Sequence, residues 1–227
     1  MNLFRFTRIP RSTVKINYYL LINSGLCSPI LNMNNPIRHR LTVFIIGLYL
    51  CLFGTSVYAG LKEDLHDGHH VLLMRHADAP GIGDPAGYKL DQCATQRNLG
   101  EHGRKQAELI GAWLTKQGID TAQVFSSPWC RCMDTAKLLK KGVVTIEASL
   151  GSFFDDMSLE KIQTQALQTF IKNSLAKKSQ PPLILVTHHI NIQAFTGKVV
   201  NVGEMVLVKV NQAGQYVGYT HFPSLMP

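Results

Sequence analysis

Two short apolar runs, far apart in the sequence, place the strongest constraint on the fold. The first spans residues 70–74 and continues into Arg75 and His76, and the second spans 183–186 and is closely followed by His188. Apolar runs of this length are typical of strands that are buried on both faces of a parallel sheet. Because ligands bind beyond the carboxyl ends of such strands, we expect the two histidines to meet at one edge of the sheet.

Strand-like and helix-like segments alternate along the rest of the chain. This alternation predicts an α/β domain, specifically a three-layer α/β/α sandwich with a mostly parallel central sheet. The first helix is expected to begin at Asn98, which with Glu101 fits a capping box. The predicted strands are 70–75, 122–126, 143–146 and 183–186, the predicted helices are 98–117, 126–142, 158–175 and 191–195, segments 203–210 and 216–220 are expected to pair as a hairpin, and 60–69 is expected to be a polar lead-in.

Residues 41–58 form the longest apolar stretch of the chain. Basic residues precede it and small residues follow it, which predicts a secretory signal peptide cleaved after Ala59 and a periplasmic or secreted mature protein. The alternative is a membrane anchor that the mature protein retains, because the stretch approaches the length needed to span a bilayer.

A translation start at Met33 would give this segment an ordinary basic leader, so 33–59 is predicted as the signal peptide. Residues 1–32 are interpreted as a mis-assigned upstream start or a disordered leader, with a genuine cytoplasmic extension as the alternative. Residues 60–227 are predicted to form one domain. Six of the 23 Lys and Arg residues precede Gly60, which leaves 17 basic against 15 acidic side chains in that domain. The basic excess therefore does not indicate a nucleic-acid-binding surface.

The predicted domain contains three cysteines, Cys93, Cys130 and Cys132. In an oxidising compartment, Cys93 could pair with either Cys130 or Cys132, which would leave one free thiol. A zinc site is the competing interpretation, but the C-x-C spacing with one distant cysteine matches zinc-ligand patterns poorly.

Two loops are expected to wall the site. The segment 78–98 is rich in glycine and proline, begins two residues after His76 and is too long to be a simple connection. The segment 147–157 follows the third predicted strand. Substrate specificity is expected to lie in these two loops, whose sequences do not name a substrate.

The basic residues at the strand ends predict an anion site. Arg131 follows the strand 122–126, so it should reach the same sheet edge as Arg75, His76 and His188. Guanidinium groups match the oxygens of phosphate bidentately, which makes phosphate the best-fitting anion. No glycine-rich P-loop or dinucleotide-binding fingerprint is present in the sequence, which disfavours a nucleotide-binding scaffold.

Four motifs in this order resemble the histidine phosphatase superfamily, which includes phosphoglycerate mutases and acid phosphatases. They are Arg75-His76-Ala77, the stretch 98–107, the stretch 126–136, and Val186-Thr187-His188. More narrowly, the sequence is similar to secreted bacterial members with an Arg-His-Ala motif, including the lipopolysaccharide heptose-phosphate phosphatase-like group. The resemblance implies a phosphoglycerate mutase-like fold.

The resemblance also implies a mechanism. Neutral His76 would attack phosphorus and form a phosphohistidine, while Arg75, Arg131 and protonated His188 bind the phosphoryl oxygens. Water would then hydrolyse the intermediate, so that a phosphomonoester or phosphoanhydride is cleaved without a metal or cofactor. The expected partner is a small phosphorylated substrate, with no nucleic acid, and no membrane unless the apolar segment is retained.

One departure from the family leaves the proton donor open. Where related proteins carry glutamate in a Leu-x-Glu pattern, this chain has Ser152. The candidates for the general acid are Asp155, Asp156, Asp78 and Asp84. Two alternatives to a phosphatase therefore stay open, a catalytically weak phosphate-binding protein and a phosphomutase.

Overall fold

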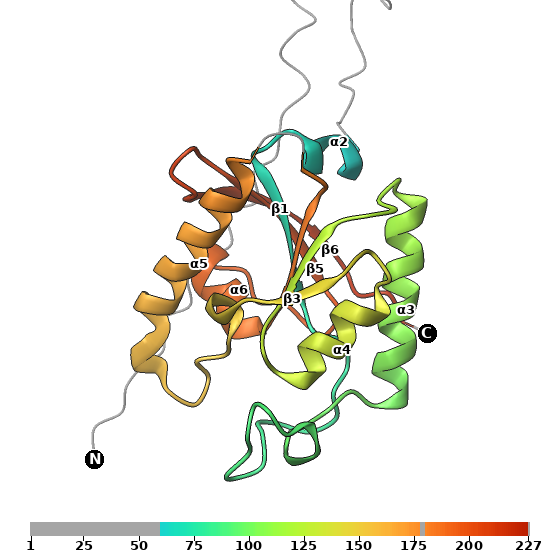
Figure 1. Ribbon diagram of the computed structural model, residues 1–227, viewed down its shortest axis with the longest axis vertical. Helices are drawn as coiled ribbons and strands as arrows, with labels where there is room; N and C mark the ends of the chain where they lie inside the picture. The colour runs from blue at the N-terminus through green and yellow to red at the C-terminus, as the bar shows by residue number, and fades with distance from the viewer. Residues whose placement is uncertain (1–59, 178–179, 227) are drawn as a thin grey trace, which may run out of the picture. The chain divides into compact units, whose positions relative to one another are not determined.

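The computed structural model describes residues 60–177 and 180–226, so the predictions for 1–59 lie outside the described residues. One six-stranded sheet forms the centre of the domain (Figure 1). Its strands lie in the order β3 (Val144–Ile146), β2 (Gln123–Ser126), β4 (Leu183–Thr187), β1 (His70–Arg75), β5 (Met205–Val210) and β6 (Tyr216–Phe222).

The first four strands in this order run parallel, and the terminal hairpin joins them antiparallel. β1 pairs in parallel with β4, and β2 pairs in parallel with both β3 and β4. β5 then pairs antiparallel with β1, and β6 with β5. The predicted mostly parallel sheet and the predicted hairpin are both confirmed.

Helices cover both faces of the sheet. The helices of the described residues are α2 (Leu61–His66), which lies at one end of the sheet, α3 (Glu101–Lys116), α4 (Cys130–Leu138), α5 (Glu160–Leu175) and α6 (His189–Thr196), together with the short 3-10 turns η1 (Cys93–Thr95), η2 (Ala148–Leu150) and η3 (Met157–Leu159). Figure 1 shows α3 and α4 on one side of the sheet and α5 and α6 on the other. The predicted three-layer α/β/α sandwich is therefore confirmed.

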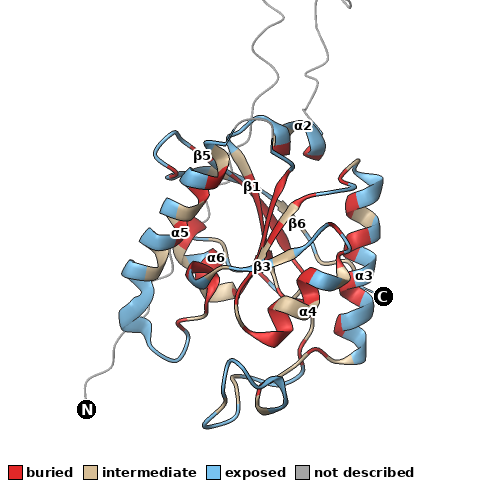
Figure 2. Cartoon of the chain, viewed as in Figure 1, coloured by how far each residue is buried: buried red, intermediate tan, exposed pale blue. Residues whose placement is uncertain are grey.

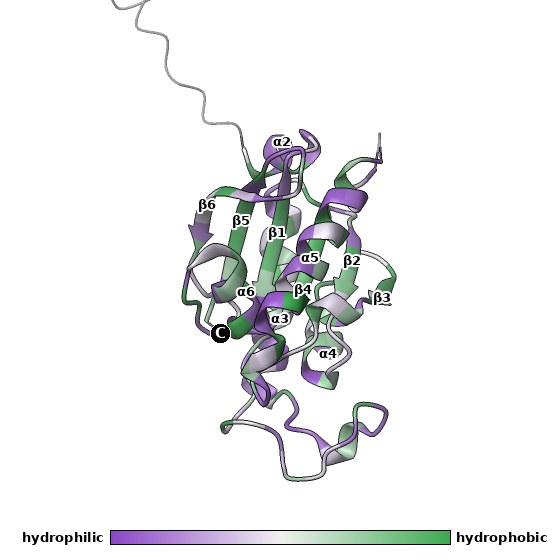
Figure 3. Cartoon of the chain, turned by 90° about the vertical axis from the view of Figure 1, so that its left-hand side faces the viewer, coloured by the Kyte–Doolittle hydropathy of each residue, from purple (hydrophilic) through white to green (hydrophobic). Residues whose placement is uncertain are grey.

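The four consecutive apolar side chains at the centre of β1 fit this layering. Leu72 and Met74 lie in the hydrophobic cluster beneath α3 and α4, whereas Val71 and Leu73 lie in the cluster beneath α5 and α6. All four side chains are completely buried. Figure 2 shows the central strands as buried and the outer helix faces as exposed, and Figure 3 shows the matching apolar and polar distribution.

The structure corrects several predicted element boundaries. The helix expected from Asn98 begins at Glu101, with Gly100 at its N-cap and no side-chain cap. The Asn98 side-chain amide instead donates to the backbone carbonyls of Cys93 and Gln96. The expected lead-in 60–69 contains the short helix α2, whose two leucines are buried.

Two further helices begin later than the sequence suggests. The helix expected to start at 126 begins at Cys130, after an extended turn at Trp129. Ser158 belongs to η3 rather than capping α5, and its amide donates to the Asp156 carboxylate at 3.1 Å. The sequence patterns therefore place the starts of both helices too early.

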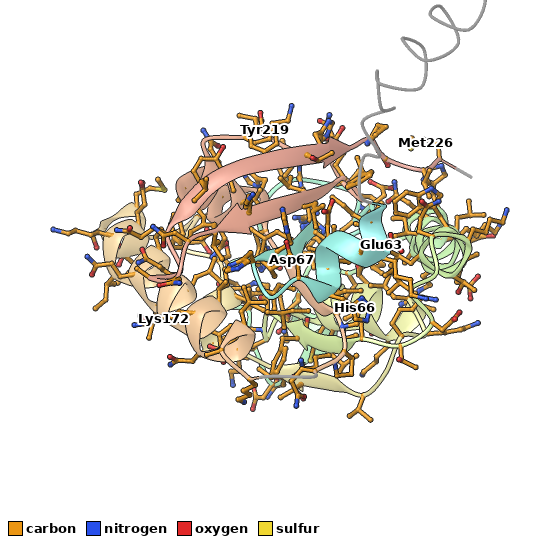
Figure 4. All side chains as sticks on the ribbon, turned by 90° about the horizontal axis from the view of Figure 1, so that it is seen from above. Glu63, His66, Asp67, Lys172, Tyr219 and Met226 are labelled. Atoms are coloured by element: carbon orange, nitrogen blue, oxygen red, sulfur yellow. A yellow bond between two sulfur atoms is a disulfide. The ribbon has the colours of Figure 1, made fainter. Side chains whose placement is uncertain are left out.

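The end of the sheet opposite the carboxyl ends of the parallel strands is closed by a turn before β1. The Asp67 carboxylate accepts hydrogen bonds from the His69 amide at 2.6 Å and lies 2.8 Å from the His70 ring nitrogen Nδ1. Figure 4 looks onto this end, with His66 and Asp67 beside α2. Across 60–177 and 180–226, the helices are all too short or too polar to cross a membrane.

Candidate active site

The two histidines follow neighbouring parallel strands. The register pairs Arg75 of β1 with Thr187 of β4, so His76 and His188 come next on adjacent strands. The His76 amide donates to the Thr187 carbonyl at 3.0 Å, which continues the strand pairing to His76. The two imidazole centroids lie 5.5 Å apart.

A cavity of about 210 Å³ opens at this edge of the sheet. Arg75, His76, Arg131 and His188 all line it, so the structure brings together the four residues that the sequence singled out. The ends of β1 and β4, and the α4 helix that follows β2, bring these basic groups together around one small cavity. Such a cavity suits an anion of the size of phosphate.

The His76 ring is held in one tautomer. Its Nδ1 lies 2.8 Å from the Ala77 carbonyl oxygen. Because a carbonyl only accepts hydrogen bonds, Nδ1 carries the proton and the lone pair of the neutral ring is on Nε2. Burial, and then the charges of Arg131 and Arg75, hold the pKa of His76 well below its ordinary value. His76 is therefore neutral at pH 7, as an attacking nitrogen must be.

His188 is neutral as well in the free site. Burial is the main cause of a pKa well below the ordinary histidine value, and the nearby His76 and Arg131 add to it. Without an anion, His188 is therefore not in the protonated form that the sequence-based mechanism assigns to it when a phosphoryl group is bound, because burial and the charge of Arg131 disfavour a further positive charge there. Its Nε2 lies 2.8 Å from the Ser127 hydroxyl oxygen, which fixes the ring orientation.

Both predicted arginines have unused donors. The Nη1 of Arg75 donates to the Val200 carbonyl at 2.9 Å, and the Nη1 of Arg131 donates to both carboxylate oxygens of Asp84 at 2.8 and 3.0 Å. In each arginine, however, Nε is buried and has no partner among the described residues. A buried donor without a partner costs ~1–3 kcal/mol, which an anion in the cavity would offset.

Sequence reasoning missed a third arginine. Arg97 lines the cavity, with Nε donating to the Gly83 carbonyl at 2.8 Å and Nη1 donating to the Ala79 carbonyl. Its pKa is lowered, chiefly by burial and then by Arg131. An isolated basic residue in a long loop carries no sequence pattern that assigns it to the site.

The structure separates the four candidate proton donors. Asp84 and Asp155 line the cavity, whereas Asp78 and Asp156 do not. Asp84 is engaged by Arg131 and by the Trp129 indole N–H at 3.0 Å. The Asp155 carboxylate accepts from a tyrosine hydroxyl of the opposite loop at 3.2 Å.

Neighbouring residues form the wall of the site. His189 lines the cavity, and its ring centroid lies 5.8 Å from that of Phe154. Trp129 is buried, and its ring centroid lies 5.1 Å from that of His188. Its packing therefore helps to hold the second histidine in place.

A disulfide joins the 78–98 loop to α4, the helix that carries Arg131. Cys93 is bonded to Cys130, and Cys132 is a buried free thiol. Of the two pairings that the sequence allowed, the structure therefore has the first. Because Cys130 begins α4 and precedes Arg131, the bond fixes the 78–98 loop directly against the anion site.

This arrangement of side chains defines a class of functional site. An α/β domain that holds a neutral histidine and several guanidinium groups at its strand ends can bind a phosphoryl group and offer it a nucleophile. Residues 71–178 match the family model of the histidine phosphatase superfamily, branch 1. Over these residues, slightly less than half of the chain, the sequence is similar to that superfamily.

The chain is also similar to solved structures. It is 17% identical to the protein histidine phosphatase SixA complexed with tungstate, with a TM-score of 0.47 over 69% of this chain and 96% of that one. It is 15% identical to a mycobacterial glucosyl-3-phosphoglycerate phosphatase, with a TM-score of 0.49 over 67% and 96%. These values are too low for any inference about activity. No curated protein matches the sequence.

Proposed function

We propose that the protein is a phosphatase that hydrolyses a phosphomonoester or phosphoanhydride through a phosphohistidine on His76. One observation carries this proposal, the neutral His76 ring whose lone pair is fixed on Nε2 beside arginines with unused Nε donors. A nucleophile and an oxyanion site are the two requirements of phosphoryl transfer without a resident metal.

In the first step, Nε2 of His76 bonds to phosphorus as the bond from phosphorus to the leaving oxygen breaks. Arg75, Arg131 and Arg97 neutralise the charge on the phosphoryl oxygens, and His188 donates a hydrogen bond or takes up a proton as the dianion enters. In the second step, water attacks phosphorus, releases inorganic phosphate and restores neutral His76.

The proton for the leaving oxygen is assigned here to Asp155. Both Asp155 and Asp84 line the cavity, but Asp155 accepts only from the neutral hydroxyl of Tyr88, whereas Asp84 is held as a carboxylate by the charge of Arg131 and by Trp129. With Ser152 at the position of the usual glutamate, leaving groups of low pKa should react fastest, since they need little proton transfer.

The test is turnover of p-nitrophenyl phosphate and trapping of the intermediate with radiolabelled substrate. His76→Ala should lower kcat/KM by at least about a thousandfold and abolish the acid-labile label. His66→Ala is the matched control, because His66 is an exposed histidine at the opposite end of the sheet. Activity of the His76 variant within tenfold of the unaltered protein would contradict the proposal.

A catalytically weak phosphate-binding protein is the second candidate. It is favoured by one observation, Ser152 at the position where related proteins carry the glutamate that acts as general acid. Phosphate binding without turnover of any phosphorylated compound would establish it. A phosphomutase needs acid and base groups in both directions, and Ser152 does not supply one; transfer of phosphate within a substrate, without release, would reveal it.

We also propose that the protein acts in the periplasm or outside the cell, as one of the secreted members with an Arg-His-Ala motif. The Cys93–Cys130 disulfide supports this location, because such bonds persist in oxidising compartments. Amino-terminal sequencing of the protein from fractionated cells is the test. A mature chain that begins at Gly60 agrees with the proposal, and a cytoplasmic protein with reduced cysteines contradicts it.

A further inference from the structure

The cavity is too small to enclose a whole substrate. At about 210 Å³ it lies below the range of ~300–1,000 Å³ that is usual for small-molecule pockets. Once a phosphoryl group occupies the basic floor, little room is left for the group attached to it. The leaving group must therefore extend across the rim.

The rim carries two exposed apolar side chains, one from each wall loop. Ile82 of the 78–98 loop is 95% exposed and Phe154 of the 147–157 loop is 47% exposed, and both line the same cavity as His76. Exposed apolar residues continue along the chain from Phe154 through η3 and into α5, at Met157, Leu159 and Ile162. Contiguous exposed apolar groups beside a polar pocket indicate a binding surface.

The rim offers few polar partners for a hydrophilic leaving group. Apart from the arginines, His76, His188 and Asp84, the polar side chains of the cavity lining are Asp155, Ser152 and His189, and Asp155 already accepts from Tyr88. A sugar would need hydrogen bonds to most of its hydroxyl groups, which these three side chains do not supply. An apolar group needs none, and it would cover surface that is otherwise exposed to water.

We infer that this site selects phosphomonoesters whose leaving group is apolar, such as an alkyl or aryl alcohol, and that Ile82 and Phe154 are its specificity-determining residues. The inference rests on the proposed function for the phosphoryl half of the site. The phosphoryl group binds the arginines and His188, and the apolar group lies between the two loops over the rim.

The test uses binding of alkylphosphonates of increasing chain length, from methyl to hexyl, measured by calorimetry on the purified protein. These probes carry the anion but cannot be hydrolysed, so the result does not depend on catalysis. Affinity should rise about twofold for each added methylene, roughly half the effect expected for complete burial. Ile82→Ser and Phe154→Ser should flatten this rise and leave the affinity for methylphosphonate within about twofold.

Val143→Ser is the matched control, because Val143 is an 88% exposed aliphatic residue outside the cavity lining. It should retain the full dependence on chain length. An affinity that does not change with chain length, or an equal loss for methyl- and hexylphosphonate in the rim variants, would overturn the inference. Hydrolysis of the matching alkyl phosphates is then measured separately, so a protein that binds the series but does not cleave it refutes the proposed function alone.

Discussion

The Cys93–Cys130 disulfide should be the largest single covalent contribution to the stability of this domain. It closes a loop with a sequence separation of 37 residues. In the chain-entropy treatment, a closed loop of this size removes enough freedom from the unfolded chain to stabilise the folded state by about 4 kcal/mol. That is a large share of the ~5–15 kcal/mol typical of whole domains.

The perturbation is the Cys93→Ser, Cys130→Ser double variant, compared with the unaltered protein in urea. With a slope of about 2 kcal/mol per molar urea, the unfolding midpoint should fall by about 2 M. A reducing agent should lower the midpoint of the unaltered protein similarly and leave that of the double variant unchanged, because Cys132 is not in a disulfide.

The disulfide should matter for the site as well as for stability. It joins the loop that carries Asp84 and Arg97 to the helix that carries Arg131, so its loss should raise KM more than it lowers kcat. An unfolding midpoint within about 0.3 M of the unaltered protein would refute the entropic reasoning. It would mean that the unfolded chain is already restricted, or that the folded loop is strained by the bond.

Three further predictions concern the Asp84 carboxylate, the pKa of His76 and the packing of Gly103. Asp84→Asn should bind phosphate about tenfold more tightly by calorimetry, because the carboxylate no longer competes for Arg131, and should melt at a lower temperature without phosphate; unchanged affinity would contradict the competition. Because the pKa of His76 is lowered, its lone pair persists as the pH falls, so the acid limb of kcat/KM should have its midpoint below 6.5, and a midpoint above 6.5 would contradict the burial argument. Gly103→Ala should destabilise the domain by ~1–3 kcal/mol in urea unfolding, since an added Cβ would lie 1.9 Å from a backbone oxygen of the 78–98 loop, whereas Gly218→Ala, which meets nothing within 4 Å, should change it by less than ~0.5 kcal/mol.

Gly103 also shows that a sequence motif can have a structural role other than the one its residues suggest. The stretch 98–107 resembles a family motif that begins a helix, but the capping interaction expected from Asn98 is absent. What the stretch provides instead is close approach, because Gly103 lets α3 pack against the backbone just after His76. The position of the helix was predictable from its apolar stripe, and the reason for its glycine was not.

The sequence by itself determined the layers of the fold and the place of four basic residues at one edge of the sheet. Both depend on short-range patterns: wholly apolar runs form buried strands, and residues after such strands emerge at one edge of a parallel sheet. Arg75, His76, Arg131 and His188 could be named because each follows such a strand directly or one turn later.

Only the tertiary structure decided what surrounds these residues. The pairing of Cys93 with Cys130, the arrival of Arg97 in the cavity, and the Asp84 carboxylate on Arg131 depend on how a long loop returns to the sheet edge. A loop of glycine and proline has no periodicity from which its path could be inferred. The neutral state of His188 has the same origin, because its pKa is set by burial and by charges that lie far away in the sequence.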